Sequence, residues 1–193
     1  LFPVLAVFKM ALRPSQDFDS SLRFWPEVFD LSNFEAVVNA PFFWQQLGNS
    51  VVIAIATTIV GIFLSCTAAY AFSRYRFPGH RAGMMTLLMT QMFPGTMMMI
   101  PLYQIIDWLG LLDQVLGLIL VYSTTAIPFC VWMLKGYFDT IPIELEESAT
   151  MDGASPFTIF WRIIIPLSRP AIAVTALFSF MTAWNEYILA ATF

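Results

Sequence analysis

Side chains that could do chemistry are few in this sequence, and they form no catalytic set. No glycine-rich nucleotide loop of the Walker type occurs, so the chain should not bind ATP in that manner. The single histidine, His80, stands among basic residues and is expected to be a solvated loop side chain. Cys66 and Cys130 lie in apolar stretches, which favours packing over a disulfide or a metal site. We therefore expect no enzyme, no metal site and no cofactor bound by this chain.

The remaining candidates are polar side chains within apolar runs: Gln91, Tyr103, Asn185 and Glu186. Glu186 is the one carboxylate in such a run, and an ionisable group at membrane depth indicates function by default. Gln91 shortly precedes Pro94, which should kink a helix beside a polar group. A translocation path would use such groups, but interhelical hydrogen bonds and packing explain them equally well. Both interpretations stay open.

Long apolar runs must position these side chains. The chain is 59% hydrophobic and 11% charged, whereas soluble domains are about 25% charged. The runs cover residues 50–73, 82–106, 114–134 and 170–193. Each reaches the roughly 20 residues that a spanning helix needs, and lipid offers no partner to open backbone groups. The sequence predicts an all-α, polytopic transmembrane helix bundle in one domain, residues 1–193.

The two ends of the sequence predict a fragment of a longer membrane protein. Residues 1–11 are apolar but too short to span, so they should be the end of a first span. The last run stops without a polar exit. Residues 12–48 are polar and then aromatic, as expected for an external segment with a short surface or re-entrant helix.

Basic residues set the orientation of a membrane protein, because Lys and Arg are retained in cytoplasmic loops. Six of the nine Lys and Arg residues lie in segments 74–81 and 135–169. Residues 107–114 carry two aspartates and no base. We therefore expect 74–81 and 135–169 on the cytoplasmic side, and 12–48 and 107–114 outside. The net charge of −4, without a basic patch, gives no indication of nucleic-acid binding.

Segment 135–169 interrupts the apolar pattern with charges and prolines. A first helix should begin near Pro142 and end at Gly153, since glycine suits the left-handed residue that terminates a helix. The helix dipole favours anions in its first turns. Three glutamates lie there: Glu144, Glu146 and Glu147.

A second helix should follow, with Ser155 as N-cap and Pro156 at its first position. Aromatic residues recur along it at helical spacing, namely Phe157, Phe160 and Trp161. A charged helical hairpin can be a solvated loop, but that role does not require aromatics beside a shaped turn. The pattern favours docking into a groove of a cytoplasmic partner.

These residues carry a resemblance. Glu147-Ser148-Ala149, then Gly153, then Ile163-Ile164-Ile165-Pro166 resembles the EAA loop of ABC-importer permeases. That loop reads Glu-Ala-Ala, three residues, Gly, nine residues, Ile-x-Leu-Pro. The spacing is intact, and Ser148 and Ile165 replace Ala and Leu. The stretches AYAFSRYRFPG, QMFP, KGYFDTIP and LEESATMDGASP resemble the MalG-type subunit of maltose and maltodextrin importers, and TAWNEYILA resembles the wider sugar-permease family.

The resemblance implies the fold of a type I ABC importer permease, a six-helix subunit in a bacterial or archaeal inner (plasma) membrane. It implies a carbohydrate importer for maltose, maltodextrin or a related sugar. Its partners would be membrane lipid, a second homologous permease subunit, an ATPase dimer that binds ATP and Mg²⁺, and an extracytoplasmic sugar-binding protein. The implied ATPase-coupling residues are Glu147, Ser148, Ala149, Asp152, Gly153, Ala154, Ile163 and Pro166.

Other classes of protein remain as alternatives. A secondary transporter driven by an ion gradient should show several midplane carboxylates and inverted repeats. Only Glu186 has such a position, and no repeat is detectable. A permease for a non-maltose sugar or a polyol is a further alternative.

Overall fold

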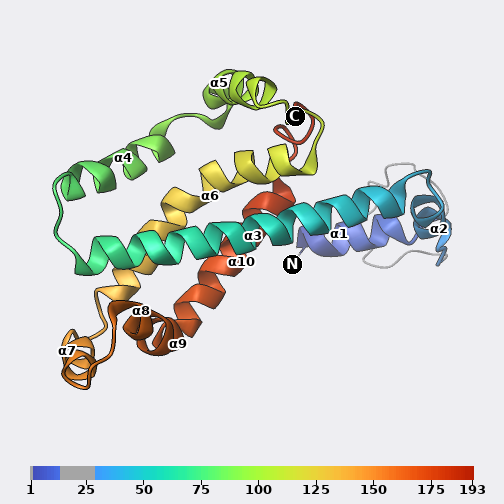
Figure 1. Cartoon of the computed structure of the whole chain (residues 1–193). Helices are drawn as coiled ribbons and strands as arrows, with labels where there is room; N and C mark the ends of the chain where they lie inside the picture. Colours follow the sequence, from blue (N-terminus) through green and yellow to red (C-terminus); the bar gives the residue numbers. More distant parts are fainter. Residues whose placement is uncertain (1, 14–28) are drawn as a thin grey trace. The chain divides into compact units, whose positions relative to one another are not determined.

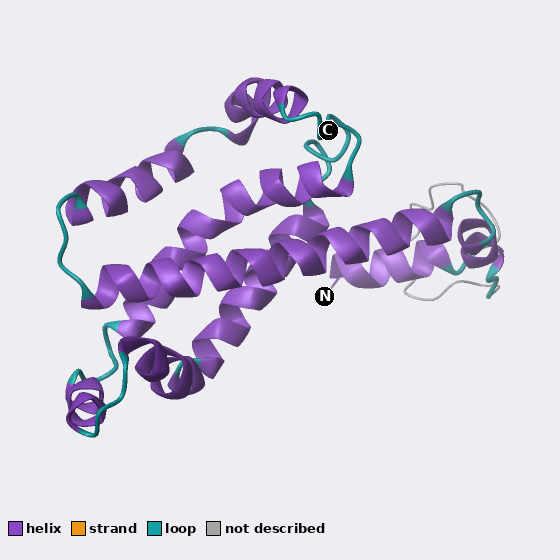
Figure 2. Ribbon diagram, in the orientation of Figure 1, coloured by secondary structure: helices purple, strands orange, loops and turns teal. Residues whose placement is uncertain are grey.

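The computed structural model describes residues 2–13 and 29–193, which are helices joined by turns (Figures 1 and 2). The chain forms two compact units, Leu1–Asn49 and Ser50–Phe193. Part of the predicted external segment, residues 14–28, lies outside the described residues.

The first unit holds α1 (Phe2–Ala11), α2 (Ser32–Val38) and the start of α3 (Phe43–Arg74). Asn33 joins the first two helices, because its Nδ2 donates to the carbonyl oxygens of Ala11 at 3.3 Å and Arg13 at 2.6 Å. α2 is thus a short helix within the segment predicted to carry one.

The second unit contains the long apolar helices. α3 has 32 residues and α6 (Val115–Phe138) has 24, and both are long and apolar enough to cross a membrane. The segment Pro156–Leu167 and α10 (Arg169–Asn185) pass the same test as a pair, bent by 77° at the buried Ser168. α6 packs against α4 and α10.

The run 82–106, predicted as one span, is two helices. α4 (His80–Met92) and α5 (Gly95–Trp108) are separated at Phe93 and Pro94, which are extended with ψ of 132° and 130°. Proline has no N–H to continue a helix, and it disfavours helical backbone in the residue before it. The predicted kink is therefore a complete break.

The run 170–193 is also not helical throughout. α10 ends at Asn185, and Glu186 is extended with ψ of 118°. The Glu186 carboxylate accepts a hydrogen bond from the Leu189 N–H at 3.0 Å and so supports a turn. Apolar composition alone does not distinguish this turn from a helix, because both lie among apolar side chains.

Two buried clusters hold the second unit together, one toward each end of α3. The first contains Ala69 and Tyr70 of α3, Phe138 of α6, and residues of the 135–169 segment such as Phe160. The second contains Ala54 of α3, parts of α5, α6 and α10, and Phe193. The 74–81 and 135–169 segments therefore lie at the same end, in agreement with the charge pattern.

Candidate functional site

The turn in segment 135–169 has the predicted geometry. α7 (Glu144–Met151) ends before Gly153, whose φ of 83° is left-handed. The Gly153 N–H donates to the Thr150 carbonyl at 3.0 Å and the Ala154 N–H donates to the Ala149 carbonyl at 2.9 Å. This pair of bonds is a Schellman motif, which satisfies the last carbonyls of a helix. Glycine reaches this conformation without steric cost.

The second helix also begins as predicted. The Ser155 hydroxyl accepts a hydrogen bond from the Thr158 N–H at 3.3 Å, and Pro156 is the first residue of α8 (Pro156–Ile159). A π-helical turn (η1, Phe160–Ile164) and α9 (Ile165–Leu167) follow. Pro166 therefore lies within this helical run, which stops at Ser168.

The aromatic residues of this helix do not form one docking face. Phe160 is buried and packs against Tyr70, with ring centroids 5.0 Å apart. Trp161 is partly exposed and stacks on Phe63 of α3 at 6.5 Å. Phe157 is 72% exposed and Trp161 is 41% exposed, and their rings contact each other with centroids 6.2 Å apart. Of the three predicted aromatics, Phe157 and Trp161 therefore remain exposed, whereas Phe160 belongs to the buried cluster.

The predicted coupling residues divide into two groups. Glu147, Ser148, Asp152 and Gly153 are exposed on α7 and its turn. Ala149, Ala154, Ile163 and Pro166 are half-buried, and the first three pack against the buried cluster beneath. One group can meet a partner, and the other attaches that surface to the bundle.

Sequence reasoning missed the role of Glu146. Its side chain is buried and accepts a hydrogen bond from the Tyr70 hydroxyl at 2.8 Å. It also forms an ion pair with Arg74. The signal in the sequence was Tyr70 and Arg74, two polar residues four apart at the end of an apolar helix, which therefore share a face.

A second polar cluster lies beside it at the end of α6. Asp139 accepts hydrogen bonds from the Ser73 hydroxyl and the Lys135 ammonium group, each at 2.6 Å. Burial opposes the charged form, but the bonds from Lys135 and Ser73 outweigh it and lower the pKa of Asp139 below its ordinary 3.8. These contacts join the end of α3 to the 135–169 segment.

A cavity of about 590 Å³ lies in the second unit at the break between α4 and α5. Gln91 and Glu186 both line it, although they are distant in the sequence. The Gln91 Nε2 donates to the Thr125 carbonyl at 3.1 Å. Hydroxyl groups on the wall come from residues that sequence reasoning did not single out: Thr90, Thr96, Thr124, Thr125 and Thr182. The cavity is mixed in character, because the rest of its lining is mostly apolar and includes Phe93 and methionine, leucine and isoleucine residues.

The other two path candidates do not line this cavity. Tyr103 packs its ring against Phe193, with centroids 5.9 Å apart. The Asn185 Nδ2 donates to the Met181 carbonyl of its own helix at 2.8 Å. The structure brings together Gln91 and Glu186 at this cavity and leaves Tyr103 and Asn185 outside its lining.

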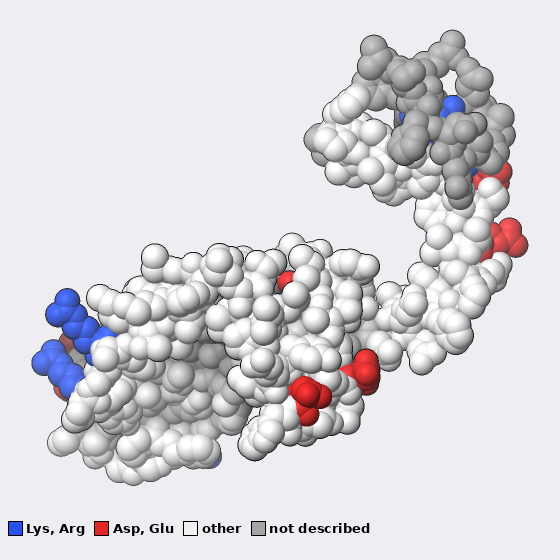
Figure 3. All heavy atoms as spheres, turned by 90° about the horizontal axis from the view of Figure 1, so that it is seen from above, with Lys and Arg blue, Asp and Glu red and all other residues white. Residues whose placement is uncertain are grey.

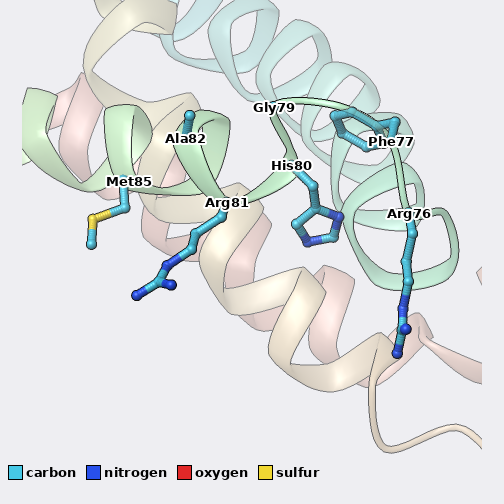
Figure 4. Close-up of a pocket in the computed structure, with 7 residues that line it drawn as sticks. All are labelled: Arg76, Phe77, Gly79, His80, Arg81, Ala82 and Met85. Atoms are coloured by element: carbon cyan, nitrogen blue, oxygen red, sulfur yellow. The ribbon is translucent and has the colours of Figure 1, made fainter.

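The connection between α3 and α4 is basic. In Figure 3 the Lys and Arg side chains visible on the second unit gather at one end. Figure 4 shows Arg76, His80 and Arg81 extending to the same side of this connection, beside an open pocket of about 930 Å³. His80 is half-buried and its Nδ1 lies 3.0 Å from the Tyr75 carbonyl oxygen. It also packs against Phe77, so it is less solvated than expected.

The comparisons with known proteins agree with this arrangement. Residues 61–193 match the family of the binding-protein-dependent transport system inner membrane component. The chain belongs to this family. It is therefore an inner-membrane permease of the ABC importer class. This membership excludes the alternative of an ion-gradient-driven transporter.

Individual relatives of this permease are carbohydrate permeases by name. The trehalose transport system permease protein SugB of Mycobacterium tuberculosis is 36% identical over 190 residues, which are 98% of this chain and 69% of that protein. The maltodextrin transport system permease protein MdxG of Bacillus subtilis is 32% identical over 189 residues, 98% of this chain and 68% of that protein.

A solved structure supports the fold of the permease. The crystal structure of a bacterial ABC transporter involved in the import of the acidic polysaccharide alginate superposes with a TM-score of 0.84 at 28% identity. The match covers 97% of this chain and 66% of that one, so this permease chain spans about two thirds of the length of its relatives.

Proposed function

We propose that this chain is the transmembrane permease subunit of an ATP-driven carbohydrate importer, and that it forms half of the translocation path. The names of its relatives support a di- or oligosaccharide, or a longer glycan, because they include trehalose, maltodextrin and alginate systems. That range leaves the individual sugar open.

The observation that carries the proposal is the exposed end of α7. A short helix that ends in a Schellman turn at Gly153 presents Glu147, Ser148 and Asp152 outward on a rigid frame. Such a helix can fit a groove of an ATPase subunit. The wider assembly would comprise a second homologous permease, two copies of the ATPase, and an extracytoplasmic sugar-binding protein. ATP and Mg²⁺ would be bound by the ATPase.

The proposed mechanism is a shift between two packings of the helices. ATP binding would close the ATPase pair and displace α7, so that the helices change from an inward-open to an outward-open arrangement. Such a shift requires that the ATPase contact differs in free energy between the two states. The cavity with Gln91 and Glu186 would receive sugar from the binding protein, and hydrolysis would reset the state.

The test is uptake by the full assembly in proteoliposomes. We expect labelled trehalose or maltodextrin to accumulate only with ATP inside, with the binding protein outside, and with an intact ATPase. Accumulation should persist after ionophores collapse the proton and sodium gradients. Uptake that continues with a hydrolysis-deficient ATPase, or that stops with the ionophores, would contradict the proposal. Calorimetry on the binding protein would identify the sugar.

A further inference from the structure

Glu146 lies on α7 but faces the membrane helices. It is 9% exposed, and both of its carboxylate oxygens accept hydrogen bonds from α3. The Tyr70 hydroxyl donates to Oε2 at 2.8 Å, and the Arg74 Nε donates to Oε1. The carboxylate therefore holds two residues that lie one helical turn apart at the end of α3.

The neighbouring glutamates of α7 differ. Glu144 and Glu147 are exposed, and within the described part of the chain no ion pair joins either of them to a base. The helix dipole would favour an acidic residue at any of these positions. It does not explain why Glu146 alone is buried against Tyr70 and Arg74.

Arg74 extends the same junction. Its Nη2 donates to the Ile141 carbonyl at 3.0 Å, in the turn that leads into α7. One guanidinium group thus binds both the helix and the turn before it. The Tyr70 ring packs on Phe160 at 5.0 Å, so the polar junction adjoins the buried apolar cluster.

The chain leaves α7 through turns on both sides, at residues 140–143 and 152–155. Turns allow a short helix to swing, whereas paired, buried charges are directional and resist displacement. Hydrogen bonds to ionised groups are about twice as strong as neutral ones.

We infer that Glu146 is a positioning residue that joins α7 rigidly to the end of α3. This inference rests on the proposed function, because α7 is there the helix that meets the ATPase. A displacement of α7 then passes directly to α3 through Tyr70 and Arg74, as well as along the chain to α10. The outer face of α7 would contact the partner, and its inner face contacts α3 through Glu146.

The first test uses Glu146→Ala in the full transporter, with Glu144→Ala as the matched control on the same helix. Glu146→Ala removes both hydrogen bonds that α3 donates to this carboxylate, so we expect sugar uptake to fall about tenfold or more, which corresponds to about 1.4 kcal/mol or more. Basal ATP hydrolysis and ATPase co-purification should stay normal, while stimulation of hydrolysis by the binding protein should be lost. Tyr70→Phe keeps the ring and removes one bond, so it should show the same uncoupling in weaker form.

The second test measures whether α7 and the end of α3 move as one body. Spin labels at Glu144→Cys on α7 and Thr67→Cys on α3 use exposed positions, whereas the two native cysteines, Cys66 and Cys130, are buried. Pulsed electron paramagnetic resonance should give one distance between the labels, unchanged by ATP. In the Glu146→Ala background the distance distribution should broaden or respond to ATP.

Three outcomes would overturn the inference: normal uptake and coupling in Glu146→Ala, a label distance that changes with ATP in the parent, or loss of the ATPase from Glu146→Ala and Tyr70→Phe. The last result would assign Glu146 to the docking surface itself. Failure of the proposed function is distinguishable, because the parent transporter would then retain no ATPase and import no sugar.

Discussion

Some acidic side chains in this permease accept hydrogen bonds from another helix, whereas others are exposed. Glu146 and Asp139 accept hydrogen bonds from α3. Glu147 and Asp152 are exposed beside a fixed turn. This division separates residues that stabilise the 135–169 segment from residues that are available to a partner.

Gly153→Val should weaken ATPase docking. The φ of 83° costs an L-residue about 1–2 kcal/mol, and β-branched residues suffer most. No atom lies within 4 Å of a Cβ at this position, so the effect would be backbone strain and not a clash. Co-purification of the ATPase should fall. Gly136→Ala is the control, since Gly136 is helical and also has open space around it. Unchanged retention and transport in Gly153→Val would refute the docking role.

Asp139→Asn should destabilise the permease in a pH-dependent manner. The folded-state pKa of Asp139 lies below 3.8, so its charge stabilises the fold above that value, and the contribution disappears as pH falls through the lowered pKa. The carboxylate is 43% exposed, and solvent screening limits the effect to about 0.2–1 kcal/mol. Thermal unfolding in detergent should show a lower midpoint for the variant at pH 7. The difference should vanish in strong acid, and a difference that is constant with pH would contradict this assignment.

Glu186→Gln should show whether sugar uptake requires the charge of this side chain or only its shape. Glutamine keeps an acceptor for the Leu189 N–H, so the turn should persist. A hydrogen bond to a charged group exceeds a neutral one by about 1 kcal/mol, which predicts a loss of sugar uptake of about fivefold. Assembly with the ATPase serves as the control. If uptake and assembly both stay normal, the charge has no role.

Among the helices and turns, prediction succeeded where a local rule applied. The cap at Ser155 and the turn at Gly153 follow from residue type and backbone geometry, and both are confirmed. The break at Pro94 was predicted only as a kink, because the length of an apolar run does not reveal whether a helix continues. The end of α10 at Asn185 coincides with a contact from Tyr122, whose hydroxyl donates to the Glu186 carbonyl at 3.3 Å. A contact between two residues so far apart in the sequence cannot be recognised from the sequence alone.

In the candidate site, too, residues identified by a local motif were predicted, and residues placed by distant contacts were not. The outward residues of α7 were predicted because a motif identifies them, although their role in coupling stays a prediction. Glu146 and the cavity threonines could not be assigned, because their environment arises from helices far apart in the chain. Asn185 bonds within its own helix and Tyr103 packs against Phe193, which is distant in the sequence, so neither contact could have been assigned from the polar residue type alone.

Gly117→Ala should disrupt the connection between α5 and α6. A Cβ at Gly117 would lie 2.2 Å from the Leu111 carbonyl oxygen, which belongs to the backbone and cannot rotate away. Overpacking of this kind costs about 1–3 kcal/mol. The thermal unfolding midpoint should fall, while Gly136→Ala in the same helix should be tolerated. A stable Gly117→Ala protein would mean that the connection can move.

In the second unit, the 135–169 segment and the cavity belong to different parts of the bundle. The buried cluster near Phe138 supports the segment, and cavity residues such as Met99 and Leu189 adjoin the other cluster. A transporter needs such a separation, because the ATPase and the sugar must be bound at different sites.

Thr182→Trp should block sugar uptake without loss of the ATPase. Thr182 lines the cavity, so an indole ring at this position would project into the cavity and narrow it. Thr67→Trp is the matched control, since Thr67 is an exposed helical threonine on α3 that does not line the cavity. Uptake and ATPase retention should be measured on the same membranes. Normal uptake in Thr182→Trp would exclude this cavity from the path.

The bend at Ser168 has a mechanical consequence. Pro156–Leu167 meets α10 at 77°, and the two share a continuous backbone through one residue. A sideways push on the short arm therefore exerts a torque about the long axis of α10. Rotation of α10 would move Thr182 around that axis and change the wall of the cavity that Thr182 lines. A lateral force on Pro156–Leu167 would thus become a rotation of α10 near Thr182.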